Sequence, residues 1–154
     1  MNFLYRWLPV GILLSFINYL SSRPSLHVVP SSWLPLWLEQ KLAAYAIKIG
    51  TTGFWSYTLT LQPEFVVRKF GHFLVFGLLG EAFFFALKSK RLGFLLAVLM
   101  AVLDEVHQGF VPGRDCRFWD IIVDSAGAYF GASIMVELID NGVKRVRHLQ
   151  KKYE

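Results

Sequence analysis

The chain is organised around four long apolar runs with polar or charged connections between them. The runs cover about Trp7 to Leu20, about Phe65 to Leu87, Leu92 through Val106, and Phe118 to about Ile139. An α-helix rises about 1.5 Å per residue, so runs of this length suit helices that cross a bilayer. The pattern therefore predicts an all-α fold, an integral membrane bundle of about four transmembrane helices that forms a single domain over residues 1–154.

The first run admits two interpretations. From Phe3 to Leu20 it reaches about 27 Å as a helix, just enough to span a bilayer. Arg6 near its start also suits a secretory signal peptide. The residues that follow, Tyr19 to Pro24, lack the small-x-small pattern of a cleavage site. We therefore prefer an uncleaved membrane anchor and keep the signal peptide as the alternative.

The segment between the first and second runs, residues 21–64, has a periodicity of its own. Apolar and aromatic residues recur there at three- and four-residue intervals: Trp33, Leu34, Trp37, Leu38, Leu42, Tyr45 and Ile49. Ser31 and Ser32 stand where a helix cap is expected, just before this pattern begins. The segment therefore predicts an interfacial helix in the first outer loop, with a re-entrant hairpin as the alternative.

The fourth run is rich in small residues. Gly127 and Gly131 stand four residues apart, a spacing that lets two membrane helices approach closely. Because glycine carries no side chain, this part of the helix is a candidate for close packing against a neighbour.

Composition supports the membrane interpretation. The chain is 55% hydrophobic and 16% aromatic, with a mean hydropathy of +0.44, which is more apolar than a soluble domain of this length. A net charge of +5 is compatible with nucleic-acid binding, but the basic residues fall in short clusters between apolar runs. That arrangement is a topology signal in membrane proteins, so we expect no nucleic-acid partner. The single cysteine, Cys116, excludes an intrachain disulfide.

The positions of basic residues predict the orientation of the bundle. Nine of them fall on one side of a four-span arrangement: Arg6, Lys88, Lys90, Arg91, Lys144, Arg145, Arg147, Lys151 and Lys152. Seven fall on the other side and are accompanied there by seven acidic residues. Short basic connections stay in the cytoplasm, so both termini are expected to be cytoplasmic, with residues 141–154 as a basic cytoplasmic tail.

The remaining charged and polar residues gather at the opposite, outer end. They form three clusters, at the start of the second run, at the end of the third, and in the link that leads into the fourth. Their members are Arg68, Lys69 and His72; Asp104, Glu105, His107 and Gln108; and Arg114, Arg117, Asp120 and Asp124. Asp104 and Asp124 fall inside their runs, where a charge is costly, so these side chains should face the bundle interior.

These clusters carry a resemblance to a known family. Arg68-Lys-x-x-His72-Phe, Asp104-Glu-x-His-Gln108, Phe110-Val-Pro-Gly-Arg114 and Asp120-x-x-x-Asp124-x-x-Gly127 follow one another in an order that resembles the VanZ-like family. The resemblance covers a motif core of residues 66–131. It implies a multi-pass protein of the bacterial cytoplasmic membrane, similar to one associated with resistance to the glycopeptide antibiotic teicoplanin. It supplies no reaction.

Three functions compete for this polar site. The favoured one is an outward pocket, formed by the eleven residues of the three clusters, that binds an anionic lipid or a lipid-linked cell-wall precursor and influences glycopeptide susceptibility. The first alternative is a membrane hydrolase or transferase, with catalytic candidates His72, Asp104, Glu105, His107 and Asp120. The second is a structural ion-pair network in an assembly protein. The sequence does not indicate an oligomeric state.

The same end of the chain also offers residues for metal and thiol chemistry. His72, Asp104, His107, Asp120 and Asp124 are plausible metal ligands, but no recognised ligand motif is present. We therefore expect no metal and no cofactor, and histidines that are bonded to carboxylates instead. Cys116 stands between Arg114 and Arg117, which should favour its thiolate form, although a lone thiol in a loop is more often incidental.

Overall fold

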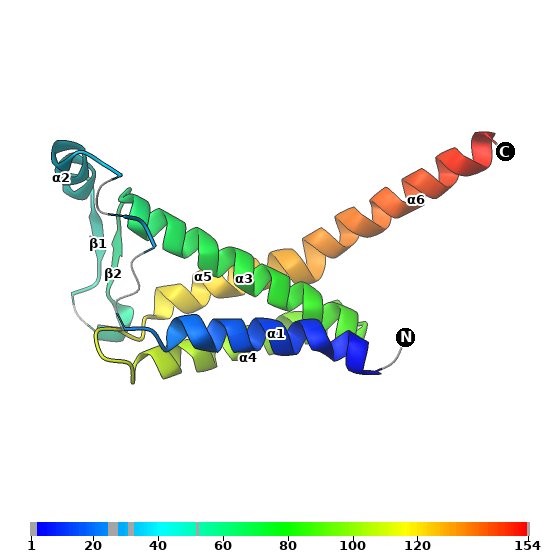
Figure 1. Ribbon diagram of the computed structural model, residues 1–154, viewed down its shortest axis with the longest axis horizontal. Coiled ribbons are helices and arrows are strands. Elements are labelled where there is room, and N and C mark those ends of the chain that lie inside the picture. Colours follow the sequence, from blue (N-terminus) through cyan, green and yellow to red (C-terminus); the bar gives the residue numbers. More distant parts are fainter. Residues whose placement is uncertain (1–2, 25–27, 31–32, 52, 154) are drawn as a thin grey trace.

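The computed structural model describes residues 3–24, 28–30, 33–51 and 53–153, with side chains described except at 140 and 146–153 (Figure 1). Its elements, in chain order, are α1 (Phe3–Ser21), α2 (Leu36–Ala44), β1 (Ile47–Ile49), a 3₁₀ turn η1 (Gly53–Trp55), β2 (Tyr57–Leu59), α3 (Pro63–Leu87), α4 (Lys90–Gln108), α5 (Phe118–Tyr129), a π-helical turn η2 (Phe130–Met135) and α6 (Val136–Tyr153).

Each of the four apolar runs forms a helix, and α5, η2 and α6 continue into one another. Three of the described helices are long and apolar enough to cross a membrane: Phe3–Ser21, Pro63–Leu87 and Phe118–Arg145. The third run forms α4, which has 19 residues and packs in the same bundle against α3 and α5. It carries Lys90 and Arg91 at one end and Asp104 and Glu105 near the other, so its apolar stretch is shorter.

The prediction of an all-helical fold needs one correction, in the segment before α3. Strands β1 and β2 pair there as an antiparallel hairpin in which Ile47 faces Leu59 and Ile49 faces Tyr57. Helix α2 covers only Leu36–Ala44, so the predicted interfacial helix is wrong at its C-terminal end, where Ile49 was expected to be helical. Gly50 and Gly53 adopt positive φ angles of 73° and 72° in the connection between the strands, which glycine tolerates best. The candidate caps Ser31 and Ser32 lie outside the described residues.

Helix α3 is the centre of the bundle, with α1, α4, α5 and η2 packed around it. The core combines large side chains, Phe76, Leu79 and Phe83, with several alanines, including Ala97, Ala101 and Ala128. Helix α1 contributes Val10 and Ile17 to this core.

Glycines set the spacing between α3 and the last helix. A Cβ on Gly77 would lie 3.3 Å from the carbonyl oxygen of Gly127, and a Cβ on Gly131 would overlap the carbonyl oxygen of Gly77. The close approach predicted from the spacing of Gly127 and Gly131 is therefore confirmed. The partner of these glycines is α3.

The chain reverses direction tightly between α3 and α4. Lys88 takes a left-handed conformation at φ 58°, and the Ser89 hydroxyl accepts a hydrogen bond from the Leu92 N–H at 3.3 Å, which caps α4. This turn lies at the same end of the molecule as the N-terminus, and α6 extends away from that end (Figure 1). The hairpin, α2 and the link between α4 and α5 lie at the other end.

Candidate functional site

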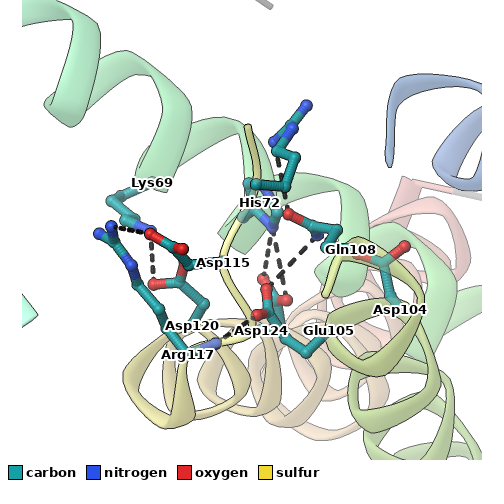
Figure 2. Close-up of polar contacts among 10 residues, drawn as sticks. Lys69, His72, Asp104, Glu105, Gln108, Asp115, Arg117, Asp120 and Asp124 are labelled. Atoms are coloured by element: carbon teal, nitrogen blue, oxygen red, sulfur yellow. Dashed lines mark hydrogen bonds and ion pairs between the residues drawn. The ribbon is translucent and has the colours of Figure 1, made fainter. Parts of the chain in front are cut away.

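The polar site lies where four helix ends meet, at the hairpin end of the bundle (Figure 1). Helices α1 and α4 end there, and α3 and α5 begin there, because helices that follow one another in the chain run in opposite directions. Residues that are far apart in the sequence are thus brought to one level. Figure 2 shows how side chains of α3, α4, α5 and the α4–α5 link converge.

Asp104 is held by two neutral donors. The Ser21 hydroxyl at the end of α1 donates to its Oδ1, and the Gln108 side-chain amide donates to its Oδ2 at 2.7 Å. Asp104 is 7% exposed. Its carboxylate is therefore fixed in direction by a residue on another helix and by a residue one turn along α4.

Glu105 joins α4 to the beginning of α5. Its side chain is fully buried, and its Oε2 accepts a hydrogen bond from the backbone N–H of Arg117, the residue that precedes α5, at 2.9 Å. A carboxylate at this position satisfies a donor at the helix N-terminus and is favoured by the helix dipole. Glu105 thus orders the link that carries Arg114.

His72 and Asp124 connect α3 to α5. The His72 Nδ1 atom lies 3.1 Å from one carboxylate oxygen of Asp124 and 3.4 Å from the other. The Asp124 side chain is fully buried, whereas that of His72 is 23% exposed. This pair is the one histidine–carboxylate contact that the described residues form.

A second α3–α5 connection lies one turn nearer the surface. Lys69 forms a short ion pair with Asp120, and its ammonium also lies 5.3 Å from the ring centre of Tyr57 and 5.6 Å from that of Phe65. The hairpin therefore covers this ion pair. Burial, followed by the charge of Asp120, raises the pKa of Tyr57 above its ordinary value, so Tyr57 stays neutral.

Arg114 is tied to neutral oxygens and not to a carboxylate. Its guanidinium donates to the Gln108 side-chain oxygen at 3.3 Å and to the backbone carbonyls of Leu20 and Arg23, each at 3.2 Å. Burial, followed by the charge of Arg68, lowers the pKa of Arg114 below its ordinary value. The guanidinium keeps its positive charge, so Arg68 and Arg114 repel each other.

Two other predicted members turn away from this centre. The Arg117 side chain pairs with exposed Asp115 at 2.8 Å, and Figure 2 shows this pair beside Lys69 and Asp120. His107 contacts the Ser22 hydroxyl at 3.1 Å and none of the described carboxylates. The structure therefore brings His72 together with a carboxylate, Asp124, and leaves His107 beside a serine.

A cavity of about 380 Å³ opens beside these residues, between α1 and α3. Its polar lining comes from Arg68, His72, Asp104, Arg114 and Ser21, and the apolar lining is larger: Phe16, Ile17, Leu20, Val28, Val67, Gly71, Val75 and Phe76. Arg68 has no hydrogen bond or ion pair with any described residue. The lining of the cavity is thus mainly apolar, and its polar part includes two guanidinium groups.

Several residues of the site were missed by the sequence interpretation. Ser21 and Ser22 were assigned to a loop but bond Asp104 and His107, and their signal was their position at the C-terminal end of the first run. Glu64 accepts hydrogen bonds from the backbone N–H groups of Val28 and Val29 at 2.8 to 3.1 Å and so holds the segment after α1 against α3. Nothing in the local pattern distinguished Glu64 from a solvated helix-start residue.

The pKa of the Cys116 thiol is shifted in the opposite direction to the one expected from its sequence neighbours. Burial, followed by the charges of Glu105 and Asp120, raises its pKa. Two flanking arginines in the sequence were expected to favour the thiolate, but the Arg117 side chain is paired with Asp115, and the charges of Glu105 and Asp120 disfavour a thiolate. That expectation is wrong.

The comparison with protein families agrees with this arrangement. The family described as VanZ/LLP1 matches residues 7–139, from α1 into α6. The chain belongs to the VanZ/LLP1 family. The match is wider than the motif core of residues 66–131, so α1 and the hairpin are part of the family's domain. Together with the candidate spans, it makes this VanZ/LLP1 protein a multi-pass membrane protein. No curated protein and no solved structure matched the chain.

Proposed function

We propose that this VanZ/LLP1 protein binds the anionic head group of a lipid, or of a lipid-linked cell-wall precursor, in the cavity between α1 and α3. The observation that carries the proposal is that two guanidiniums, those of Arg68 and Arg114, line the same cavity. Neither is paired with a carboxylate in the described part of the chain. Phosphate or carboxylate between them relieves their repulsion, and arginine suits bidentate contact with both.

The apolar wall supports an amphiphilic ligand. Phe16, Val75 and Phe76 line the side of the cavity that leads away from the arginines. A cavity of this size is in the range of small-molecule sites, and its apolar lining suits an acyl or prenyl chain. A free inorganic anion would leave that wall unused.

We further propose that α4 is a fourth transmembrane helix, with both termini in the cytoplasm of a bacterial cell and the cavity at the outer face. Apolar residues of α4 such as Leu95, Leu99 and Leu103 are exposed on the bundle surface, where lipid would cover them. The N-terminus and the basic α3–α4 connection lie at one end of the molecule (Figure 1), in keeping with short basic connections in the cytoplasm.

Susceptibility to teicoplanin tests the proposal in cells. The variants are Arg68→Gln in the cavity and Arg91→Gln, an exposed arginine at the other end of the bundle, as the matched control. Wild type and Arg91→Gln should lower susceptibility equally, whereas Arg68→Gln should lose the effect at unchanged membrane abundance. If both variants protect equally, the cavity has no role in susceptibility. If Arg68→Gln is less abundant in the membrane than the wild type, Arg68 is needed for the fold.

A membrane hydrolase or transferase is the second candidate, and the His72–Asp124 pair favours it. His72 lines the cavity and is backed by a buried carboxylate, the arrangement that orients a general base. Under this alternative, His72→Gln abolishes protection while ligand retention is unchanged. If protection survives in His72→Gln, acid/base catalysis by this histidine is excluded.

A further inference from the structure

Three potential metal ligands meet at the inner side of the cavity. His72 on α3, Asp104 on α4 and Asp124 on α5 each offer one ligand atom, and these atoms lie within 4.8 Å of one another. The three residues are separated by at least twenty positions along the chain. Their convergence is therefore produced by the packing of three helices.

The spacing suits a single ion. Ligands about 2.1 Å from a metal lie about 3.0 to 3.4 Å from one another in octahedral or tetrahedral geometry. The His72 Nδ1 atom lies 3.1 and 3.4 Å from the two Asp124 oxygens, which already matches. The ligand atom of Asp104 lies within 4.8 Å of the other two, so it must come closer for all three to bind one ion.

The charges around the cluster favour a cation. Asp104, Glu105 and Asp124 are all buried, and none of them forms an ion pair with a lysine or arginine of the described chain. Lys69 is committed to Asp120, and Arg117 to Asp115. Buried carboxylates are paired, protonated or bound to metal, and three of them so close together leave a deficit of positive charge.

The surroundings are those of a metal ligand set. Ser21 and Gln108 donate to the two oxygens of Asp104 and fix its direction, as second-sphere hydrogen bonds do for ligating carboxylates. The cavity reaches both His72 and Asp104, so an ion has a route of entry and positions left open for a ligand.

We propose that His72, Asp104 and Asp124 bind one divalent transition-metal ion, Zn²⁺ or Mn²⁺. One imidazole with two carboxylates suits these ions better than Mg²⁺ or Ca²⁺, which prefer oxygen ligands alone. The ion goes beyond the anion site proposed above, because its three ligands do not include Arg68 or Arg114. Its open positions face the cavity and would contact an anionic group held there.

Metal binding by the purified protein tests this inference. The full chain in a neutral detergent is stripped with a chelator, and the binding of Zn²⁺ and of Mn²⁺ is measured by calorimetry and by elemental analysis after desalting. We expect about one ion per chain for the wild type, and a dissociation constant at least about 10-fold higher for His72→Gln and for Asp124→Asn.

The controls are His107→Gln and Asp120→Asn, a histidine and an aspartate of the same end that lie outside the ligand set. Both should bind the ion as the wild type does. The inference is overturned if the stripped wild type binds neither ion, or if His72→Gln and Asp124→Asn bind it as tightly as the controls. Absence of metal binding by the wild type is enough to overturn the inference, so the test does not depend on whether the variants fold. If the wild type binds no metal but still retains an amphiphile with a phosphate head group, the metal inference fails while the proposed anion site stands.

Discussion

Arg68 and Arg114 line the same cavity but are held very differently. Arg114 donates to Gln108 and to two backbone carbonyls at the end of α1, whereas Arg68 has no acceptor among the described residues. Arg114 therefore contributes to the fold as well as to the proposed site. Arg68 forms no such bond to the described residues, so the proposed ligand would be its main partner.

This difference predicts unequal effects on stability. Arg114→Gln should lower the free energy of unfolding by about 1–3 kcal/mol, because the Gln108 oxygen and the carbonyls of Leu20 and Arg23 lose a charged donor. Arg68→Gln should leave it within about 0.5 kcal/mol of the wild type. Thermal unfolding of both variants in one detergent checks this, and an equal loss would show that Arg68 is also structural.

The thiol of Cys116 provides a pH-dependent test of the local field. Its pKa is raised, so the rate of reaction with maleimide should rise with pH and reach half of its maximum above about pH 8.5, the value of a free cysteine. The same thiol in protein unfolded by sodium dodecyl sulfate is the reference. A midpoint below that reference would mean that the arginines, and not Glu105 and Asp120, dominate the field.

At this scale the sequence predicted which residues gather but not which of them touch. Charges inside apolar runs pointed to Asp104 and Asp124, because the bilayer penalises them unless they face the bundle interior. The pairing of His72 with Asp124, and of His107 with Ser22, depends on helix rotation and on side-chain directions. A pattern of apolar positions does not determine helix rotation and side-chain direction accurately enough to say which side chains form a hydrogen bond.

At the scale of elements, small residues decide how closely α3 and the last helix approach. Gly131 lies against the backbone of Gly77, with no room for a Cβ, and Gly127 lies in the same way against Phe73. The approach brings His72 within reach of Asp124, so the helix spacing and the site geometry depend on the same contacts.

Gly131→Ala should therefore separate the two helices and lower stability by about 1–3 kcal/mol through overpacking. Gly71→Ala on α3 is the matched control, since a Cβ there meets nothing within 4 Å and alanine is the better helix former. Thermal unfolding of the two variants measures the difference. A Gly131→Ala protein as stable as Gly71→Ala would contradict the close packing.

The long helices followed from their apolar runs, whereas the hairpin did not. Residues from Trp33 to Ile49 repeat at helical intervals, yet β1 begins at Ile47. A strand of three residues is too short to show a clear alternation of apolar and polar positions. This hairpin is stabilised by contacts of the Trp55 and Tyr57 rings with aromatic residues at the start of α5. Tertiary contacts of that kind override a local periodicity.

At the scale of the whole molecule, the antiparallel bundle separates two ends with different roles. One end holds the N-terminus, the α3–α4 turn and the exit of α6, and the other holds the hairpin, the cavity and the polar cluster (Figure 1). The division into a basic end and an end that gathers the other polar residues follows from the sequence, because the charge clusters lie in short connections whose positions do not depend on how the helices pack. The cavity does not, since it depends on how α1 lies against α3.

Retention of a phosphate-headed amphiphile by the purified protein tests the central claim most directly. Native mass spectrometry of the wild type in neutral detergent should show one bound dodecyl phosphate per chain and no bound dodecanol. Arg68→Gln should bind the phosphate about 10-fold more weakly or worse, because a charged hydrogen bond to the ligand is lost. Arg91→Gln should match the wild type. Equal retention of dodecyl phosphate by Arg68→Gln and the wild type, or none by the wild type, would contradict the account.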